Sequence, residues 1–189
     1  FFEIAGYVSV LFFFWRLCYD RCQSCRLQLE HFIENYKQYE NLAEVRVHSH
    51  VEKGSRRYPL VSVHFGNKSA PALVMVGGVH GLERIGAQLT LSMLDGFYQR
   101  LSWDTALAEM LSKIQLVFIP LVNPFGYFDV TRSNANGVDL MRNAPIDAEE
   151  KVPFLLGGHR HSPKLSWYRG ERVEQESQFV FDVMGEVLK

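Results

Sequence analysis

The sequence has no excess of either charge and no apolar segment of membrane-spanning length. Its 20 Lys and Arg residues nearly balance its 21 Asp and Glu residues, which gives a formal net charge of −1. A surface with this balance does not attract polyanions, so nucleic acid is not expected as a partner. The apolar stretch at residues 4–15 is shorter than the roughly 20 residues of a spanning helix, so a membrane partner is not expected. We interpret this stretch as a buried element or the remnant of a targeting segment.

Cysteine is also scarce, and all of it lies in one short stretch. Cys18, Cys22 and Cys25 have a C-x3-C-x2-C spacing, and their odd number argues against a disulfide framework. The spacing resembles the cluster-binding loop of radical S-adenosylmethionine enzymes, in which three thiolates hold an iron–sulfur cluster. Ser24 stands where that family usually has an aromatic residue. We therefore interpret these cysteines as ordinary reduced thiols and keep cluster binding as an alternative.

Repeats and low-complexity linkers are absent, so we expect one α/β domain behind a short N-terminal region. Residues 1–43 are expected to hold the apolar segment and an amphipathic helix, because apolar residues recur at helical spacing over residues 26–42. Residues 44–189 are expected to form the α/β domain. Its expected strands are residues 44–51, 60–65, 72–76 and 114–119, and its expected helices are residues 84–100, 104–112 and 174–188.

The order of these elements predicts the sheet. Residues 72–76 are a short apolar run stopped by a Gly-Gly pair, which is typical of an interior strand. Strand, helix and strand between residues 72 and 119 predict a right-handed parallel crossover. Gly66 and Asn67 predict a hairpin-like return from the strand at 60–65 into the next strand. The expected fold class is therefore α/β, with a mixed, mostly parallel central sheet flanked by helices.

The strand expected at residues 44–51 carries two histidines. Alternation places Val45, Val47 and Val51 on one face and Arg46, His48 and His50 on the other. Two histidines at strand spacing are compatible with a metal site, but we interpret this second face as a solvated one.

His80 and Glu83 are the first candidate metal ligands. They follow the strand at 72–76 and open a helix, so both side chains are expected at the carboxyl end of the sheet, where open α/β sheets bind ligands. A His nitrogen and a Glu oxygen are common zinc ligands, and catalytic zinc takes three protein ligands plus a water. A turn His beside a capping Glu is the alternative, because H-x-x-E recurs by chance.

A second constellation follows the strand at 114–119. Arg132 and Arg142 bracket a Gly-containing turn. Their guanidinium groups suit a carbonyl oxygen and a carboxylate, because Arg binds oxyanions bidentately and stays charged. Asp139 fits as the carboxylate that accepts a hydrogen bond from the ligand His and fixes its tautomer. Each residue alone suits a solvated loop, but together they favour a metal site with substrate-binding cations.

These motifs, in their order, resemble those of the carboxypeptidase A-like zinc peptidases. The resemblance covers roughly residues 44–189 and is closest to the bacterial branch that carries D-L-x-R-N. The matching pieces are Gly77-Gly-Val-His80-Gly-Leu-Glu83, Asn123-Pro-Phe-Gly-Tyr127, Arg132-x-Asn134, Gly137-Val-Asp139-Leu-Met-Arg142-Asn143, and Trp167-Tyr-Arg-Gly170 followed by Glu174-Gln-Glu176.

The resemblance implies a role for each of these residues. His80 and Glu83 would bind Zn2+, and Asp139 would orient His80. Arg132 would polarise the scissile carbonyl, while Arg142 and Asn143 would bind the carboxylate of the substrate. The implied activity is hydrolysis, by zinc-activated water, of a peptide or amide bond near a free carboxylate of a peptide or small-molecule substrate.

The chain also departs from the family pattern. The third ligand of the family, a His in an H-S pair, and its general-base Glu follow the last matching piece, and neither is seen here. We therefore expect a catalytic domain truncated at its C-terminus. His161 precedes Ser162 and is an alternative third ligand, although it lies in the wrong place in the order. Met141 replaces the usual Asn before Arg142, which weakens the assignment as a strict carboxypeptidase.

Two alternatives stay open on these grounds. One is a zinc amidohydrolase related to aspartoacylase, in which the third His follows at a shorter spacing. The other is a catalytically inactive binding module with the carboxypeptidase fold. A truncated sheet would also leave the strand at 72–76 or at 114–119 with an open apolar edge, so we expect self-association.

Overall fold

The computed structural model describes residues 27–147, 149–150, 152–153 and 156–188. It divides into two compact units, residues 1–35 and residues 36–189. The three cysteines and residues 4–15 lie outside the described residues. Residues 27–35 are α-helical, and the second unit begins with the 3-10 helix η1 (Tyr36–Asn41). The helix expected over residues 26–42 is therefore observed in these two parts.

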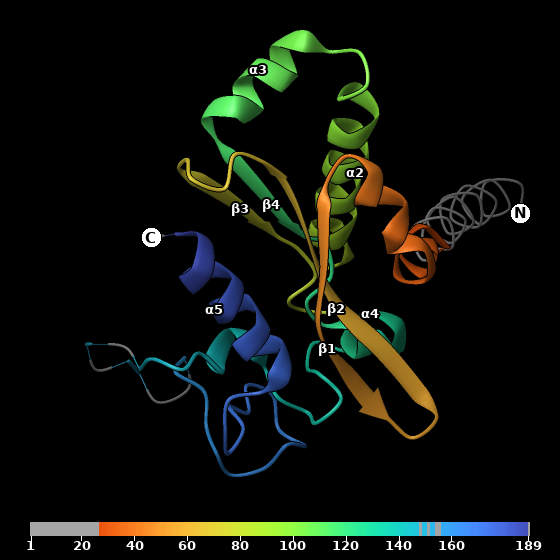
Figure 1. Cartoon of the computed structure of the whole chain (residues 1–189). Helices are drawn as coiled ribbons and strands as arrows, with labels where there is room; N and C mark the ends of the chain where they lie inside the picture. The colour runs from red at the N-terminus through yellow and green to blue at the C-terminus, as the bar shows by residue number, and fades with distance from the viewer. Residues whose placement is uncertain (1–26, 148, 151, 154–155, 189) are drawn as a thin grey trace, which may run out of the picture. The chain divides into compact units, whose positions relative to one another are not determined.

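Four strands form one mixed sheet in the order β1–β2–β4–β3 (Figure 1). β1 pairs with β2 and β2 pairs with β4 in antiparallel fashion, whereas β3 and β4 are parallel. The α/β class with a mixed sheet flanked by helices is thus confirmed, and the parallel pairing of β3 with β4 is the one expected from the crossover. The expectation of a mostly parallel sheet does not hold for the described strands, because two of their three pairings are antiparallel. The strands are β1 (Glu44–Lys53), β2 (Arg56–Gly66), β3 (Ala72–Val76) and β4 (Gln115–Ile119).

The position of β3 differs from the expectation in two ways. β4 lies between β2 and β3, so the predicted hairpin-like return from β2 into β3 is wrong. All five residues of β4 are buried. This strand lies inside the sheet, where other elements cover it on both faces. β3 therefore lies at the edge of the described sheet instead of in its interior, and the side chain of Leu73 is 56% exposed.

Helices cover both faces of the sheet in Figure 1. α2 (Arg84–Arg100) packs on one face, where the ring of Phe97 lies 5.7 Å from that of Phe118. α5 (Gln175–Val187) packs on the other face, where Phe179 joins Val117 in a buried cluster. Because successive side chains of a strand point to opposite faces, β4 contributes to both cores.

A β-bulge changes the faces of β1. The register between β1 and β2 shifts between Val47 and Ser49. Arg46 donates to Glu186 of α5 at 2.6 Å, and the ring of His48 lies 4.9 Å from Phe179, so both face α5. Val51, after the bulge, packs into the same cluster as Phe179. The expected alternation, with Val51 opposite Arg46, is therefore wrong because the extra residue reverses the sidedness of the strand.

The remaining helices follow the local signals in the sequence. α3 (Thr105–Lys113) begins at Asp104, whose carboxylate accepts a hydrogen bond from the backbone N–H of Leu107 at 3.0 Å. α4 (Pro124–Asp129) and the 3-10 helix η2 (Leu140–Arg142) are short and lie near the candidate site. No helix in the described part of the chain combines the length and apolarity that a membrane crossing requires.

Candidate metal and substrate site

The segments that leave the two parallel strands meet at one end of the sheet. The backbone N–H of Val122, after β4, donates to Gly77 at 3.1 Å, and that of Asn123 donates to Gly78 at 2.9 Å. The side chain of Asn123 then caps α4 by accepting from Gly126 N–H at 2.8 Å and donates to Val79 at 3.2 Å. Asn123 therefore fixes the loop that carries His80 against the start of α4.

Two glycines allow this contact. A Cβ atom at Gly81 would lie 1.8 Å from the carbonyl carbon of Gly126, and a Cβ atom at Gly126 would lie 2.4 Å from the amide nitrogen of Asn123. No side chain fits at either distance. The Gly residue after His80 is therefore required by the close approach of two backbones.

His80 lies between two carboxylates. His80 is 4% exposed. Its Nδ1 atom lies 3.0 Å from Oε1 of Glu83, and its Nε2 atom lies 3.1 Å from Oδ1 of Asp139. An ionised Asp139 accepts hydrogen bonds only, so this contact requires the proton on Nε2. In the neutral ring, Nδ1 then keeps its lone pair on the side of Glu83. The structure thus brings together three of the predicted site residues.

The donor pair fits a zinc ion. Two atoms that bind one tetrahedral zinc at about 2.0–2.1 Å lie about 3.3 Å apart, close to the 3.0 Å between Nδ1 of His80 and Oε1 of Glu83. A third ligand is not at hand, because the described residues contain no group of three or more His, Cys, Asp or Glu side chains that can hold a metal. The exposed His161, whose ring stacks on that of His159, is not brought together with this pair.

Arg132 connects the two carboxylates. Its Nε atom donates to Oδ2 of Asp139 at 3.0 Å, and its Nη1 atom donates to Oε1 of Glu83 at 3.0 Å. Burial alone would raise the pKa of Asp139, but the hydrogen bonds and charges of Arg132 and His80 outweigh it and lower the pKa below its ordinary value. Asp139 is thus held as a carboxylate at the centre of the site.

Arg142 is the second cation at this carboxylate. Its Nη1 atom donates to Oδ2 of Asp139 at 2.8 Å, and its Nε atom donates to the carbonyl of Leu156 at 3.1 Å. The guanidinium lies 5.3 Å from the centre of the Trp167 ring. Beside it is a hollow of about 540 Å³ whose lining includes the apolar side chains of Met141, Ile146, Val152 and Leu156.

Asn143 is buried, and its side chain bonds to backbone groups of the chain. The residue is 4% exposed, and its two amide hydrogens are used in bonds to the carbonyls of Arg169 at 2.7 Å and Arg172 at 2.8 Å. Its Oδ1 atom accepts from the backbone N–H of Glu174 at 2.7 Å. The substrate-binding role expected for Asn143 stays a prediction, whereas its observed contacts join the site loop to the segment before α5.

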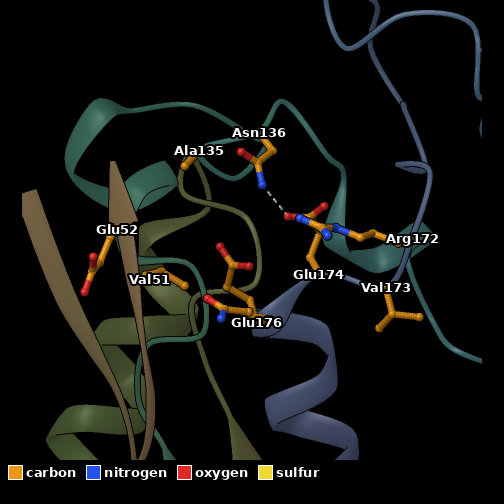
Figure 2. Close-up of a pocket in the computed structure, with 9 residues that line it drawn as sticks. Val51, Glu52, Ala135, Asn136, Arg172, Val173, Glu174 and Glu176 are labelled. Atoms are coloured by element: carbon orange, nitrogen blue, oxygen red, sulfur yellow. Dashed lines mark hydrogen bonds between the residues drawn. The ribbon is translucent and has the colours of Figure 1, made fainter. Parts of the chain in front are cut away.

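A buried polar cluster strengthens the same junction, and Figure 2 shows several of its side chains around a pocket of about 390 Å³. Asn134 donates to Glu174 at 3.0 Å and to Glu176 at 3.2 Å, and Asn136 donates to Glu174 at 2.6 Å. Burial raises the pKa of Glu176, although its own backbone N–H and Asn134 oppose this effect. Asn134, Glu174 and Glu176 lie within the matching sequence motifs. The spacing of the motifs did not predict that these three side chains bond to one another.

Comparisons with known proteins identify a family. The family model described as zinc carboxypeptidase matches residues 29–187. The chain is 28% identical to carboxypeptidase SOL1 of Arabidopsis thaliana over 131 residues, which covers 65% of this chain and 26% of that protein. It is 30% identical to the human carboxypeptidase N catalytic chain over 125 residues, which covers 58% of this chain and 27% of that protein. The chain thus spans about a quarter of the length of these relatives.

Solved structures share the fold. The bovine thrombin-activatable fibrinolysis inhibitor, solved with a tick carboxypeptidase inhibitor, has a TM-score of 0.60 at 20% identity and covers 83% of this chain and 54% of its own. A metallo-carboxypeptidase from Pseudomonas aeruginosa was solved with (2-guanidinoethylmercapto)succinic acid. Its TM-score is 0.54 at 20% identity, and the match covers 84% of this chain and 36% of that protein's chain. Since the family model also matches most of the sequence, the chain belongs to the zinc carboxypeptidase family.

Proposed function

We propose that this chain supplies two zinc ligands and the substrate-binding cations of a zinc-dependent metallocarboxypeptidase. His80 and Glu83 would hold the metal, which supplies an activated water for hydrolysis of a peptide or amide bond when bound. The observation that carries the proposal is the arrangement of His80, which faces Glu83 through Nδ1 and the buried Asp139 through Nε2. This is the arrangement in which a carboxylate fixes the tautomer of a ligand His.

The two arginines suit the two oxygen-bearing groups of such a substrate. Arg132 is held at Nε by Asp139, so its outer nitrogen atoms can donate to the carbonyl oxygen of the scissile bond. Arg142 lies beside the apolar-lined hollow, where its charge would bind the free carboxylate next to a side chain that fills the hollow. Asp139 orients His80 and keeps both guanidinium groups in place.

Zinc binding to the full chain tests the metal part of this proposal. We expect His80→Ala and Glu83→Gln to abolish zinc uptake measured by elemental analysis and calorimetry. His161→Ala serves as the matched control and should leave uptake unchanged, because His161 is not grouped with the other two residues. Uptake that is insensitive to both ligand substitutions would overturn the assignment. Uptake lost in His161→Ala as well would identify His161 as the third ligand.

A catalytically inactive binding module is the second candidate. Two observations favour it: the described residues offer no third ligand, and Arg132 already pairs with Glu83. This candidate predicts that an N-acylated dipeptide binds in the presence of a chelator, is not hydrolysed, and loses affinity when its carboxylate is amidated or Arg142 is replaced by Gln. Zinc-dependent hydrolysis of the same dipeptide would reject it. The matching family model favours the carboxypeptidase assignment over one related to aspartoacylase.

A further inference from the structure

We propose that Arg132 and zinc compete for the same oxygen of Glu83, so that metal binding releases the outer end of Arg132. This inference rests on the proposed function, because it assumes that His80 and Glu83 bind the metal. It adds a coupling between metal uptake and the availability of Arg132 to a substrate.

The geometry places both cations at one atom. Oε1 of Glu83 lies 3.0 Å from Nδ1 of His80 and 3.0 Å from Nη1 of Arg132. It is therefore the oxygen that faces the other candidate ligand and also the oxygen that the guanidinium occupies. A dication and a guanidinium on one carboxylate oxygen repel each other, and this repulsion is strong at such a short distance. Zinc and Nη1 of Arg132 are thus alternative partners of Oε1.

The two ends of Arg132 are held unequally. Its Nε atom bonds to Asp139, whose side chain is fully buried at 0% exposed. Its Nη1 atom bonds to Glu83, whose side chain is 61% exposed. An exposed ion pair is weak and a buried carboxylate keeps its partners, so the contact to Glu83 is the one that yields. Arg132 can then turn away from Glu83 while Asp139 still holds its Nε atom.

The consequence is a defined order of events. Glu83 and Asp139 both bind Arg132, and its outer end is directed at Glu83. With zinc bound, Nη1 would lose this partner and become available to the carbonyl oxygen of a substrate. Coupling of this kind is reciprocal: removal of the guanidinium must raise the affinity for zinc by the same free energy by which zinc weakens the contact.

Zinc affinities of four variants of the full chain test this inference, measured by competition with a chelating dye. Arg132→Gln should bind zinc at least about tenfold more tightly than the wild type, because a competing charge is removed. Arg56→Gln is the control: it removes a cation that pairs with Asp129, outside the candidate site. Its affinity should stay within about threefold of the wild type. Glu83→Gln and His80→Ala report whether the zinc is at this site.

Three results are distinguishable. Tighter binding in Arg132→Gln alone supports the inference. Equal affinities in the wild type, Arg132→Gln and Arg56→Gln, with binding lost in His80→Ala, overturn the inference and leave the proposed function standing. No site-dependent zinc in any variant overturns the proposed function and this inference with it.

A measurement on the wild type does not depend on the folding of Arg132→Gln. In a chain with 15N-labelled arginine, zinc should shift the side-chain N–H signals of Arg132 and leave those of Arg56 unchanged, because Arg56 pairs with Asp129. Arg132 signals that stay in place at saturating zinc would contradict the inference.

Discussion

Nε2 of His80 lies 3.1 Å from Oδ1 of Asp139, although 59 positions separate the two residues in the chain. Asp139 also accepts from Arg132 and Arg142 through its other oxygen, so one buried carboxylate holds three side chains of the site. Substitution of Asp139 therefore tests more of the site than any other single change.

Asp139→Asn should lower both stability and zinc affinity. The amide has the same shape, but its NH2 group replaces an acceptor oxygen either at His80 or at the two guanidinium groups. Both guanidinium groups also lose their buried counter-charge, so we expect a loss of about 3–5 kcal/mol in the free energy of unfolding. Zinc affinity should fall by about 10–100-fold because His80 loses its orienting partner. Urea unfolding and zinc titration measure the two effects.

Asp147→Asn is the control for this change. Asp147 pairs with Arg169, but its side chain is 80% exposed. We expect its substitution to cost less than about 1 kcal/mol. Equal losses in the two variants would show that Asp139 has no special role in holding the site.

Asn143→Asp should destabilise the junction between the site loop and the segment before α5. The substitution keeps the shape but removes the two N–H donors to the carbonyls of Arg169 and Arg172. Two buried acceptors then lose their partner and face a carboxylate, so we expect a loss of about 2–4 kcal/mol in urea unfolding. The exposed Asn41 gives the control, since Asn41→Asp should change stability by less than about 0.5 kcal/mol. A substrate-binding role would instead weaken substrate binding in Asn143→Ala while stability stays unchanged.

Stability should fall on mild acidification because of His64. This residue is 3% exposed, its Nε2 atom lies 2.7 Å from Oγ of Ser62, and burial, with a smaller effect of the charge of Arg46, lowers the pKa of His64 to about 4. The unfolded chain binds this proton near pH 6.5 and the folded chain only near pH 4, so acid favours unfolding between these values. We expect the free energy of unfolding to fall by about 2–3 kcal/mol between pH 7.5 and pH 4.5.

Two variants isolate the contribution of His64. In His64→Gln, much of the decline between pH 6.5 and pH 4.5 should disappear, because the titrating group is gone. In His161→Gln, which changes an exposed residue, the decline should persist. An unchanged pH profile in His64→Gln would assign the decline to other groups.

The open edge of β3 should promote self-association. β3 pairs only with β4 in the described sheet, and Leu73 on this strand is 56% exposed. A short apolar edge with unpaired backbone groups is a template for another chain. Leu73→Lys should therefore increase the monomer fraction in light scattering at high concentration. Leu165→Lys, at a loop position with 57% exposure, should not. A wild type that stays monomeric at high concentration would reject the expectation.

The sequence by itself determined the local elements and the family. The β-branched runs, the Asp104 cap and the helical spacing after Glu83 are set by neighbours a few positions apart, and the structure confirms the strands and helices that they predicted. The ordered motifs likewise identified the zinc carboxypeptidase family, which the family match confirms.

Only the tertiary structure decided which partners these elements take. The bulge after Val47 and the insertion of β4 between β2 and β3 depend on groups 14 or more residues apart. So do the contact of Arg132 with Glu83 and the bond of His48 to Ser62. Spacing along the chain does not encode such contacts, because each is selected by packing and charge once distant segments have met. The fold therefore determines how the predicted site residues are connected.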